Sequence, residues 1–245
     1  MKPTLFLSDL HLAAARPAQV AAFRAFCAGP AREAAGVYVL GDLFDAWIGD
    51  DQLREPLAGE VTAALRTVAD AGVPVGVISG NRDFLLGERF AQAAGAMLLP
   101  GQMVVSVGGT QTLILHGDEL CTADVAYQRF RRFSREPRWQ RAWLALPYAA
   151  RRALAGWLRG RSRSATADKP EQIMDADPAA IVAAFRAANV TRMVHGHTHR
   201  PARHHLLVDG RACERFVLAD WYARGSYLEF DAEGGRTRDV PSAGG

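Results

Sequence analysis

The sequence contains few cysteines and no long apolar segment. Its three cysteines, Cys27, Cys121 and Cys213, are widely spaced and form no CxxC pair, which argues against a disulfide framework or a zinc ribbon. No run approaches the roughly 20 apolar residues that a membrane-spanning helix needs, and the first residues lack the regions of a secretory signal. We therefore expect reduced thiols in a cytoplasmic protein that is soluble or peripheral to a membrane.

Positive charge is concentrated in one segment. The 245 residues, of which 49% are hydrophobic and 22% charged, suit one large globular domain or two small ones. The net charge is only +3, whereas residues 125–169 contain 12 Lys and Arg against 2 Asp and Glu, so the remainder is acidic. Such a basic block indicates a surface that faces an anionic partner. An ordinary solvated helical surface is the alternative explanation.

Short β-rich runs alternate with helical patterns in the first half of the chain. Strands are predicted at 4–8, 36–40, 74–79 and 112–115, helices at 17–29 and 54–72, and antiparallel strands near 203–208, 214–219 and 225–230. This alternation favours an α/β fold built from parallel βα units.

Residues 123–169, which we call the insertion, interrupt the alternation. They are Arg-rich, favour helix, and include Tyr127, Phe130, Phe133, Trp139, Trp143, Tyr148 and Trp157. We interpret them as a helical cap inserted into a core formed by residues 1–122 and 170–245. So many aromatic side chains cannot all be buried in such a short segment, so part of its apolar surface should stay exposed.

Five short motifs offer metal-type ligands, most of them directly after an apolar run. They are Asp9-Leu10-His11, Gly41-Asp42-Leu43-Phe44-Asp45, Gly80-Asn81-Arg82-Asp83, His116-Gly117-Asp118 and His195-Gly196-His197-Thr198-His199. The carboxyl ends of parallel strands meet at one edge of a sheet, so we expect the motifs to converge. Carboxylate, amide and imidazole ligands without thiolate suit Mn²⁺, Fe²⁺ or Zn²⁺. Two such cations about 3.5–4 Å apart hold a phosphoryl group and activate a water, which predicts an enzyme acting on phosphate esters.

The order of these motifs resembles that of the calcineurin-like metallophosphoesterases. The resemblance implies a sandwich of two mixed β-sheets flanked by helices. It also implies one cation held by Asp9, His11, Asp42 and His199, and a second held by Asp42, Asn81, His116 and His197. Asp45, Asp83, Asp118 and His195 would orient these ligands. A buried, hydrogen-bonded role is the alternative for His195.

One position departs from that family. Most members carry a histidine after the asparagine of the third motif, where this chain has Arg82. An arginine stays protonated and cannot act as a general acid, although its planar fork binds phosphate well. A site without a general acid works best on a leaving group that is stable as an anion, which favours a pyrophosphate over an alkyl phosphodiester. Pairing of Arg82 with Asp83 or another carboxylate is the alternative.

A closer resemblance covers nearly the whole chain. Asn-Arg-Asp-Phe at 81–84, His-Gly-Asp-Glu-Leu-Cys-Thr from 116, Ile173-Met174-Asp175 and His-Gly-His-Thr-His-Arg-Pro from 195 resemble the UDP-2,3-diacylglucosamine pyrophosphatases of lipid A biosynthesis. The resemblance implies an enzyme with two Mn²⁺ per chain, at the cytoplasmic face of the inner membrane. Water would attack the α-phosphorus of UDP-2,3-diacylglucosamine and give UMP and 2,3-diacylglucosamine 1-phosphate (lipid X). No nucleic acid or obligate protein partner is expected.

The resemblance also assigns residues to the reaction. The catalytic set would be Asp42, Asn81, Arg82 and His116, and the substrate contacts Asn81, Arg82, Asp124, Ser162, Thr166, Lys169 and His197. Thr166 stands where relatives often carry Asn. Ser162, Thr166 and Lys169 are alternatively ordinary surface residues.

The insertion would then bind the lipid part of the substrate. Its apolar side chains would line a groove for two acyl chains, and Arg131, Arg132, Arg151 and Arg152 would meet anionic headgroups, at about 1 kcal/mol each. One alternative is a nuclease with the same metal centre, in which the insertion stacks on nucleic acid bases. Another is a non-catalytic scaffold of the same fold, although such relatives lose ligands that are all present in this chain.

Overall fold

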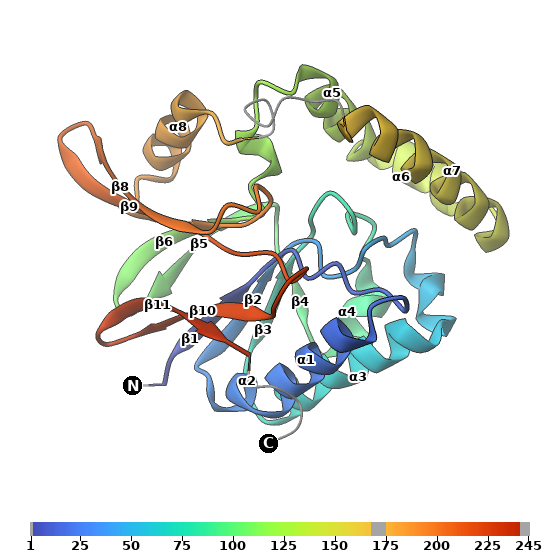
Figure 1. The fold of residues 1–245 in the computed structure, drawn as a ribbon, viewed down its shortest axis with the longest axis horizontal. Helices are drawn as coiled ribbons and strands as arrows, with labels where there is room; N and C mark the ends of the chain where they lie inside the picture. Colours follow the sequence, from blue (N-terminus) through green and yellow to red (C-terminus); the bar gives the residue numbers. More distant parts are fainter. Residues whose placement is uncertain (1, 168–174, 241–245) are drawn as a thin grey trace.

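Two mixed β-sheets pack face to face, with helices on their outer sides (Figure 1). The computed structural model describes residues 2–167 and 175–240, and side chains are not described for residues 159–167. The strand order is β11-β10-β1-β2-β3-β4 in the first sheet and β5-β6-β7-β9-β8 in the second. The predicted sandwich is therefore confirmed.

Parallel strands form the centre of both sheets. The first sheet contains β1 (Thr4–Leu7), β2 (Gly36–Leu40), β3 (Val75–Ile78), β4 (Met97–Leu98), β10 (Ser226–Asp231) and β11 (Gly234–Asp239). The second contains β5 (Gln102–Val107), β6 (Thr110–Leu115), β7 (Arg192–His195), β8 (Ala202–Val208) and β9 (Arg211–Val217). Strands β1 to β4 run parallel, as do β6, β7 and β9, while β10, β11, β5 and β8 pair antiparallel.

Helices cover the outer face of each sheet. Against the first sheet lie α1 (Pro17–Ala28), α2 (Pro30–Glu33), α3 (Pro56–Asp70) and α4 (Glu88–Ala94), and against the second lies α8 (Pro178–Ala188). Pro17 and Pro56 occupy first helical positions, which need no backbone donor. Val61, Leu65 and Val68 recur at helical spacing and are buried. Helix α3 begins later than predicted because η1 (Asp50–Arg54) forms a separate 3₁₀ turn.

The side chains of each central strand alternate between two apolar layers. Leu5 and Leu7 of β1 pack with the helices of the first sheet, whereas Phe6 between them packs into the layer that joins the two sheets. A third layer packs the second sheet against α8, with Met193 and Phe185 among its residues. The strands are thus buried on both faces, and their carboxyl ends are held rigidly.

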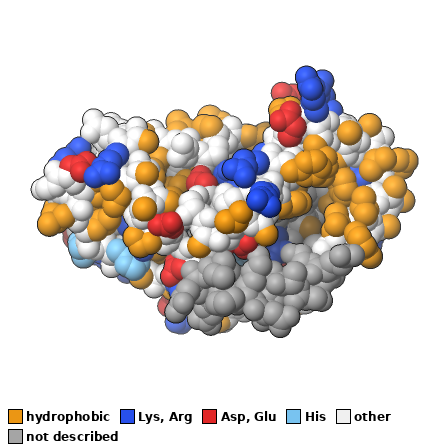
Figure 2. Space-filling view, turned by 90° about the horizontal axis from the view of Figure 1, so that it is seen from above, with side chains coloured by type: hydrophobic (Ala, Val, Ile, Leu, Met, Phe, Trp, Pro, Cys, Tyr) orange, Lys and Arg blue, Asp and Glu red, His pale blue; other side chains and the backbone are white. Residues whose placement is uncertain are grey.

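The insertion contains three helices that extend away from the sandwich (Figure 1): α5 (Val125–Ser134), α6 (Pro137–Leu144) and α7 (Tyr148–Ala167). Phe133 and Trp157 are 55% and 56% exposed, whereas Trp143 is buried. Figure 2 shows hydrophobic side chains gathered over the end of the molecule that the insertion forms. Exposed apolar surface was expected here and is present. None of the helices in residues 2–167 and 175–240 combines the length and the apolar character needed to cross a bilayer.

Candidate metal centre

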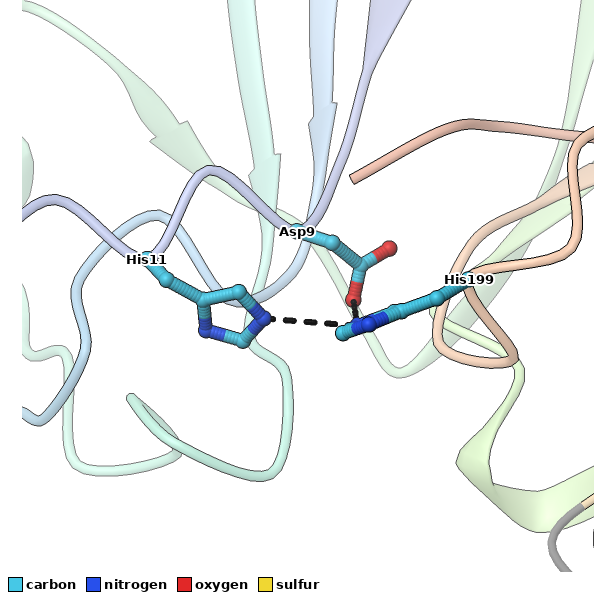
Figure 3. Close-up of side chains that lie close together, drawn as sticks. All are labelled: Asp9, His11 and His199. Carbon is cyan, nitrogen blue, oxygen red and sulfur yellow. Dashed lines mark hydrogen bonds and ion pairs between the residues drawn. The ribbon is translucent and has the colours of Figure 1, made fainter. Parts of the chain in front are cut away.

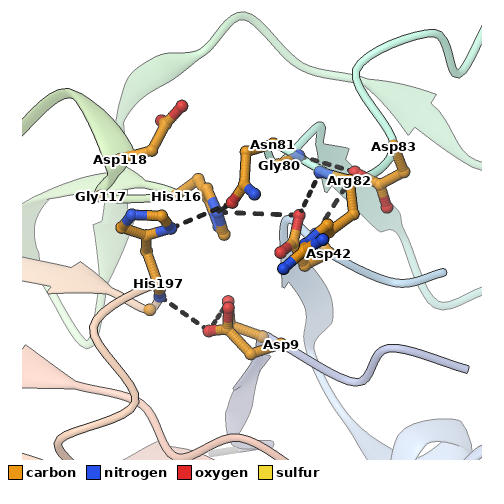
Figure 4. A network of polar contacts seen from close by, with 12 residues as sticks. Asp9, Asp42, Gly80, Asn81, Arg82, Asp83, His116, Gly117, Asp118 and His197 are labelled. Atoms are coloured by element: carbon orange, nitrogen blue, oxygen red, sulfur yellow. Dashed lines mark hydrogen bonds and ion pairs between the residues drawn. The ribbon is translucent and has the colours of Figure 1, made fainter. Parts of the chain in front are cut away.

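The predicted metal ligands come from both sheets and meet at one edge of the sandwich (Figure 4). They follow the carboxyl ends of five strands: Asp9 and His11 after β1, Asp42 after β2, Asn81 after β3, His116 after β6, and His197 and His199 after β7. Strands β1 to β3 belong to the first sheet and β6 and β7 to the second. Packing of the two sheets therefore brings these side chains together.

Asp9, His11 and His199 form one compact group (Figure 3). His199 Nε2 lies 3.3 Å from Asp9 Oδ1 and 3.4 Å from His11 Nε2, and His11 Nδ1 lies 3.7 Å from Asp42 Oδ2. Within the described part of the chain, Asp9 Oδ1 and His11 Nδ1 are buried without a hydrogen bond. Buried polar atoms that make no hydrogen bond fit a centre that binds a cation.

Asp9, Asp42 and His116 form a neighbouring group. His116 Nε2 lies 3.8 Å from Asp42 Oδ1, and Asn81 Oδ1 lies 3.1 Å from His116 Nε2 and 3.0 Å from His197 Nδ1. The two carboxylate oxygens of Asp42 thus face different groups, Oδ2 toward His11 and Oδ1 toward His116. That is the position a ligand shared by two cations needs.

Many of these ligand candidates have a backbone conformation that side chains rarely adopt. The φ angles of Asp9, His11, Asp42, His197 and His199 lie between 47° and 68°. Only two other non-glycine residues in the described part of the chain, Asn189 and Asp209, have positive φ. Such conformations cost about 1–3 kcal/mol each and cluster at functional sites, where the surrounding fold maintains them.

Two motif glycines are required because ligands lie against their backbone. A Cβ atom on Gly80 would overlap the carboxylate of Asp42, and one on Gly196 would overlap Ser8 and the carboxylate of Asp9. Any side chain at either position would displace a carboxylate of the centre.

Asp83 holds two motif loops together. Its carboxylate is buried and accepts the backbone N–H groups of Gly80 (2.7 Å) and Leu43 (2.8 Å), with longer contacts to those of Asp42 and Phe44. It therefore acts on the backbone that carries the ligand candidates. Both carboxylate oxygens of Asp83 are thus occupied, and no ion pair joins Asp83 to Arg82 among the described residues. The alternative that Arg82 pairs with Asp83 is therefore wrong.

The remaining predicted orienting residues have varied partners. His195 is buried, its Nδ1 donates to Gly196 O (2.9 Å), and its Nε2 accepts from Arg215 Nη1 (3.1 Å). Asp45 pairs with Arg16, and Asp118 turns toward α5 rather than toward the ligand candidates. These contacts fit the alternative that His195 is a buried, hydrogen-bonded residue.

Two residues beside the centre follow β9 in a segment without any motif. The Tyr222 ring stacks on His11, with centroids 5.1 Å apart, and Asp220 Oδ2 lies 3.5 Å from His199 Nδ1. The backbone N–H of Trp221 donates to Asp9 O (3.2 Å) and brings this segment to the centre. A carboxylate behind a ligating histidine fixes the ring orientation. No spacing or composition signal in the sequence marks these positions.

Burial and neighbouring charges shift the pKa values of the ligand candidates in different directions. Burial lowers the pKa of His11 to about 4 and that of His197 to about 3, so both imidazoles are neutral at pH 7. Burial also raises the pKa of Asp42. At His116, burial opposes protonation, but the charges of Asp42, Asp9 and Asp118 outweigh it and raise the pKa. In the absence of a cation, Asp42 and His116 together therefore hold a proton at neutral pH.

The predicted substrate contacts are only partly described. The backbone N–H of Arg82 donates to Asp42 Oδ1 (2.8 Å), so Arg82 lies beside the centre (Figure 4). The Asp124 carboxylate caps α5 by accepting the Tyr127 N–H (3.0 Å). Ser162 and Thr166 belong to the part of α7 without described side chains, and Lys169 lies outside the described residues.

Two of the four arginines expected to face a membrane are turned toward the core. Arg151 is 3% exposed and donates to Ile48 O, Leu146 O and the Asp51 carboxylate. Arg131 Nε donates to Asp118 Oδ2 (2.8 Å). Arg132 and Arg152 are exposed. The prediction is therefore wrong for Arg131 and Arg151, because each has a buried acceptor within reach.

Comparison with known proteins agrees with this geometry. Residues 2–201 match the model of the calcineurin-like phosphoesterase family. The UDP-2,3-diacylglucosamine hydrolase of Cellvibrio japonicus is 48% identical over 231 residues, which cover 94% of this chain and 96% of the relative. The hydrolase of that name from Escherichia coli O81 is 46% identical over 230 residues, covering 94% and 95%. The chain therefore belongs to the calcineurin-like phosphoesterases and, within them, to the family of the UDP-2,3-diacylglucosamine hydrolases.

Proposed function

We propose that this protein hydrolyses the pyrophosphate bond of UDP-2,3-diacylglucosamine to UMP and 2,3-diacylglucosamine 1-phosphate in lipid A biosynthesis. The observation that carries the proposal is the position of Asp42, whose two oxygens face two adjacent groups of imidazole, carboxylate and amide ligand candidates. The names of the relatives supply the substrate.

We assign one Mn²⁺ to Asp9, His11, Asp42 and His199, and a second to Asp42, Asn81, His116 and His197. The donor set fits because it consists of oxygen and imidazole nitrogen, and the buried Asp9 Oδ1 and His11 Nδ1 make no hydrogen bond among the described residues. Bound there, the cations would neutralise phosphate charge and lower the pKa of a water that attacks the α-phosphorus.

The protein side chains would position the substrate and limit the reaction to stable leaving groups. Asn81 and His197 lie within the centre. Arg82 would bind a phosphate oxygen through its fork, since its guanidinium has no ion pair among the described residues. With no general acid beside the leaving group, a departing sugar phosphate suits this site better than an alkoxide.

We infer that the insertion holds the lipid. A cleft of about 460 Å³ lies between α7 and the loops after β1 and β2. Leu12, Phe44 and Ile48 form part of its apolar wall, and Tyr148 and Arg152 contribute polar groups from α7. It adjoins the first two metal motifs, which suits acyl chains attached to a sugar phosphate. Exposed arginines of the insertion would bind the anionic inner-membrane surface.

Product analysis tests the proposal directly. The purified protein should release UMP from UDP-2,3-diacylglucosamine only when Mn²⁺ is present, and Asp42→Ala should abolish the release. In ¹⁸O-labelled water the label should enter UMP, since attack is placed at the α-phosphorus. No UMP from the wild type would refute the assignment. Strong, salt-sensitive binding to single-stranded DNA would favour the nuclease alternative instead, and absence of two-site Mn²⁺ binding the scaffold.

A further inference from the structure

One buried carboxylate joins the fourth metal motif to the insertion. Asp118 is 1% exposed and lies two residues after His116. Its Oδ2 accepts hydrogen bonds from Tyr127 Oη (2.5 Å), Arg131 Nε (2.8 Å) and Arg135 Nη2 (3.5 Å). These donors are spaced four residues apart, so they form one stripe along α5 and its C-terminal cap. A single oxygen thus fixes α5 over its full length.

The backbone around Asp118 adds a further contact with α5. Gln128 Nε2 donates to Asp118 O (2.8 Å) and to Cys121 O (3.1 Å). These bonds hold the first turn of α5 on η2 (Asp118–Leu120), the 3₁₀ turn that begins at Asp118. Helix α5 is thereby attached to the fourth motif through both side-chain and backbone acceptors.

The donors of this stripe also contact two other metal motifs. The Tyr127 ring stacks on His197, with centroids 6.0 Å apart and planes 27° apart. Arg135 Nη2 donates to Gly80 O (3.1 Å), the carbonyl directly before Asn81, and its guanidinium lies over the Phe84 ring. Helix α5 therefore connects the third, fourth and fifth motifs, and Asp118 is the acceptor that its three donors share.

Ion pairs between a buried carboxylate and partly exposed arginines specify geometry more than they add stability. Removing water from a carboxylate and a guanidinium costs much of what their attraction returns, whereas loss of one partner leaves the other buried and unpaired. The arginines of α5 differ accordingly, because Arg131 and Arg135 reach Asp118 while Arg129 and Arg132 stay exposed. The same segment thus has one side directed at the metal centre and another at solvent.

We propose that Asp118 is a positioning residue that holds helix α5, and with it the insertion, in register with the metal centre. It acts through Tyr127 on the His197 ring and through Arg135 on the carbonyl of Gly80, directly before Asn81. Its expected effect on turnover rests on the proposed function, because the insertion matters only for a substrate that contacts it.

Amide hydrogen exchange of the full-length, Mn²⁺-loaded protein tests the positioning separately from activity. Asp118→Asn keeps the shape but removes the charge, and exchange in residues 125–135 should rise about tenfold or more, with no change in β1, β2 and β3. Tyr127→Phe, a milder variant that removes only one donor, should cause a smaller rise at the same amides. Arg186→Gln, which breaks the exposed pair with Asp209, is the control and should leave residues 125–135 unchanged.

Kinetics supply the second measurement. Asp118→Asn should lower kcat/KM for UDP-2,3-diacylglucosamine by about 10–100-fold, mainly through KM. Unchanged exchange in residues 125–135, or a uniform rise that includes β1 to β3, would refute the positioning role. If the wild type releases no UMP, the proposed function fails while the exchange result still decides the role of Asp118.

Discussion

The metal centre and the insertion use polar side chains in opposite ways. At the centre, ligand candidates follow the ends of buried strands, five of them with positive φ, and the folded backbone determines where each donor atom lies. In the insertion, one run of arginines is divided between buried contacts with the core and exposed positions, and the helix faces decide which is which. The ends of buried strands hold the ligand candidates in place, whereas the insertion contacts the centre with one side of its helices and exposes the other side to solvent.

Replacing Asp42 should have the largest effect. Asp42→Asn keeps the side-chain shape, and Asn tolerates positive φ, so the fold should be retained. The change removes the charge that faces both groups of ligand candidates. Activity should fall by more than the roughly 10–100-fold that loss of a hydrogen-bond partner behind a ligand costs.

Asp209→Asn is the matched control for Asp42→Asn. Asp209 also has a positive φ (51°), but it lies in the exposed β8–β9 turn and pairs with Arg186. Steady-state UMP release should be unaffected. Similar losses in the two variants would mean that the backbone conformation, and not the position of Asp42 between the two groups, is what matters.

The centre was predictable because short sequence patterns indicate both the ligand residues and the strands that they follow. Residues such as Asp42 and His116 follow apolar runs, and the ends of such runs meet at a sheet edge. The contribution of Asp220 and Tyr222 was not predictable, because it depends on how the segment after β9 returns to Asp9. Strand β11 (Gly234–Asp239) was also missed, since its glycines and charges carry no strand pattern and its pairing with β10 defines it.

Neighbouring arginines of α7 allow the division within the insertion to be tested. Arg151→Met should lower the free energy of unfolding by about 1–3 kcal/mol, because Ile48 O and the Asp51 carboxylate would lose a buried donor. Arg152→Met should change the free energy of unfolding by no more than about 0.5 kcal/mol. Arg152 is exposed, and its ion pair with Glu55 is long, at 3.9 Å. Urea denaturation of both variants measures the difference. Equal losses would contradict the assignment of Arg151 as an internal anchor.

Composition alone could not predict which of these arginines are buried and which are exposed. The sequence places twelve basic residues in 125–169, but the partner of each depends on helix rotation and on acceptors far along the chain. Arg151 meets Ile48 and Asp51 about a hundred residues away. The amount of charge and of apolar surface was therefore predictable, but which side chains face the core and which face solvent was not.

Exposed arginines should govern attachment to membranes. Replacing Arg132 and Arg138, both exposed, with Gln should weaken binding to vesicles containing phosphatidylglycerol by about 30-fold, at about 1 kcal/mol for each charge. Flotation at low ionic strength measures the change. Arg186→Gln with Arg211→Gln removes the same charge from the region of α8 and the β8–β9 turn and should have little effect. Equal weakening by both pairs would indicate a response to net charge alone.

The smallest expected effect is the release of a proton when Mn²⁺ binds. Because Asp42 and His116 together retain a proton at neutral pH, and a ligating imidazole must be neutral, binding of Mn²⁺ should release about one proton from this pair. His199, whose pKa burial lowers but the Asp9 carboxylate raises to a greater extent, adds to the release. His11 and His197 contribute none, since their lowered pKa values leave them already unprotonated. Mn²⁺ affinity should consequently rise as the pH increases through the raised pKa of the pair.

Calorimetric titrations at pH 7.5 in two buffers of different ionisation enthalpy measure the number of protons that Mn²⁺ binding releases. His205→Asn, at an exposed histidine of β8, should not alter it. Titrations without proton release would show that Asp42 is already ionised and His116 already neutral before the cation binds, and would contradict the raised pKa values of the pair.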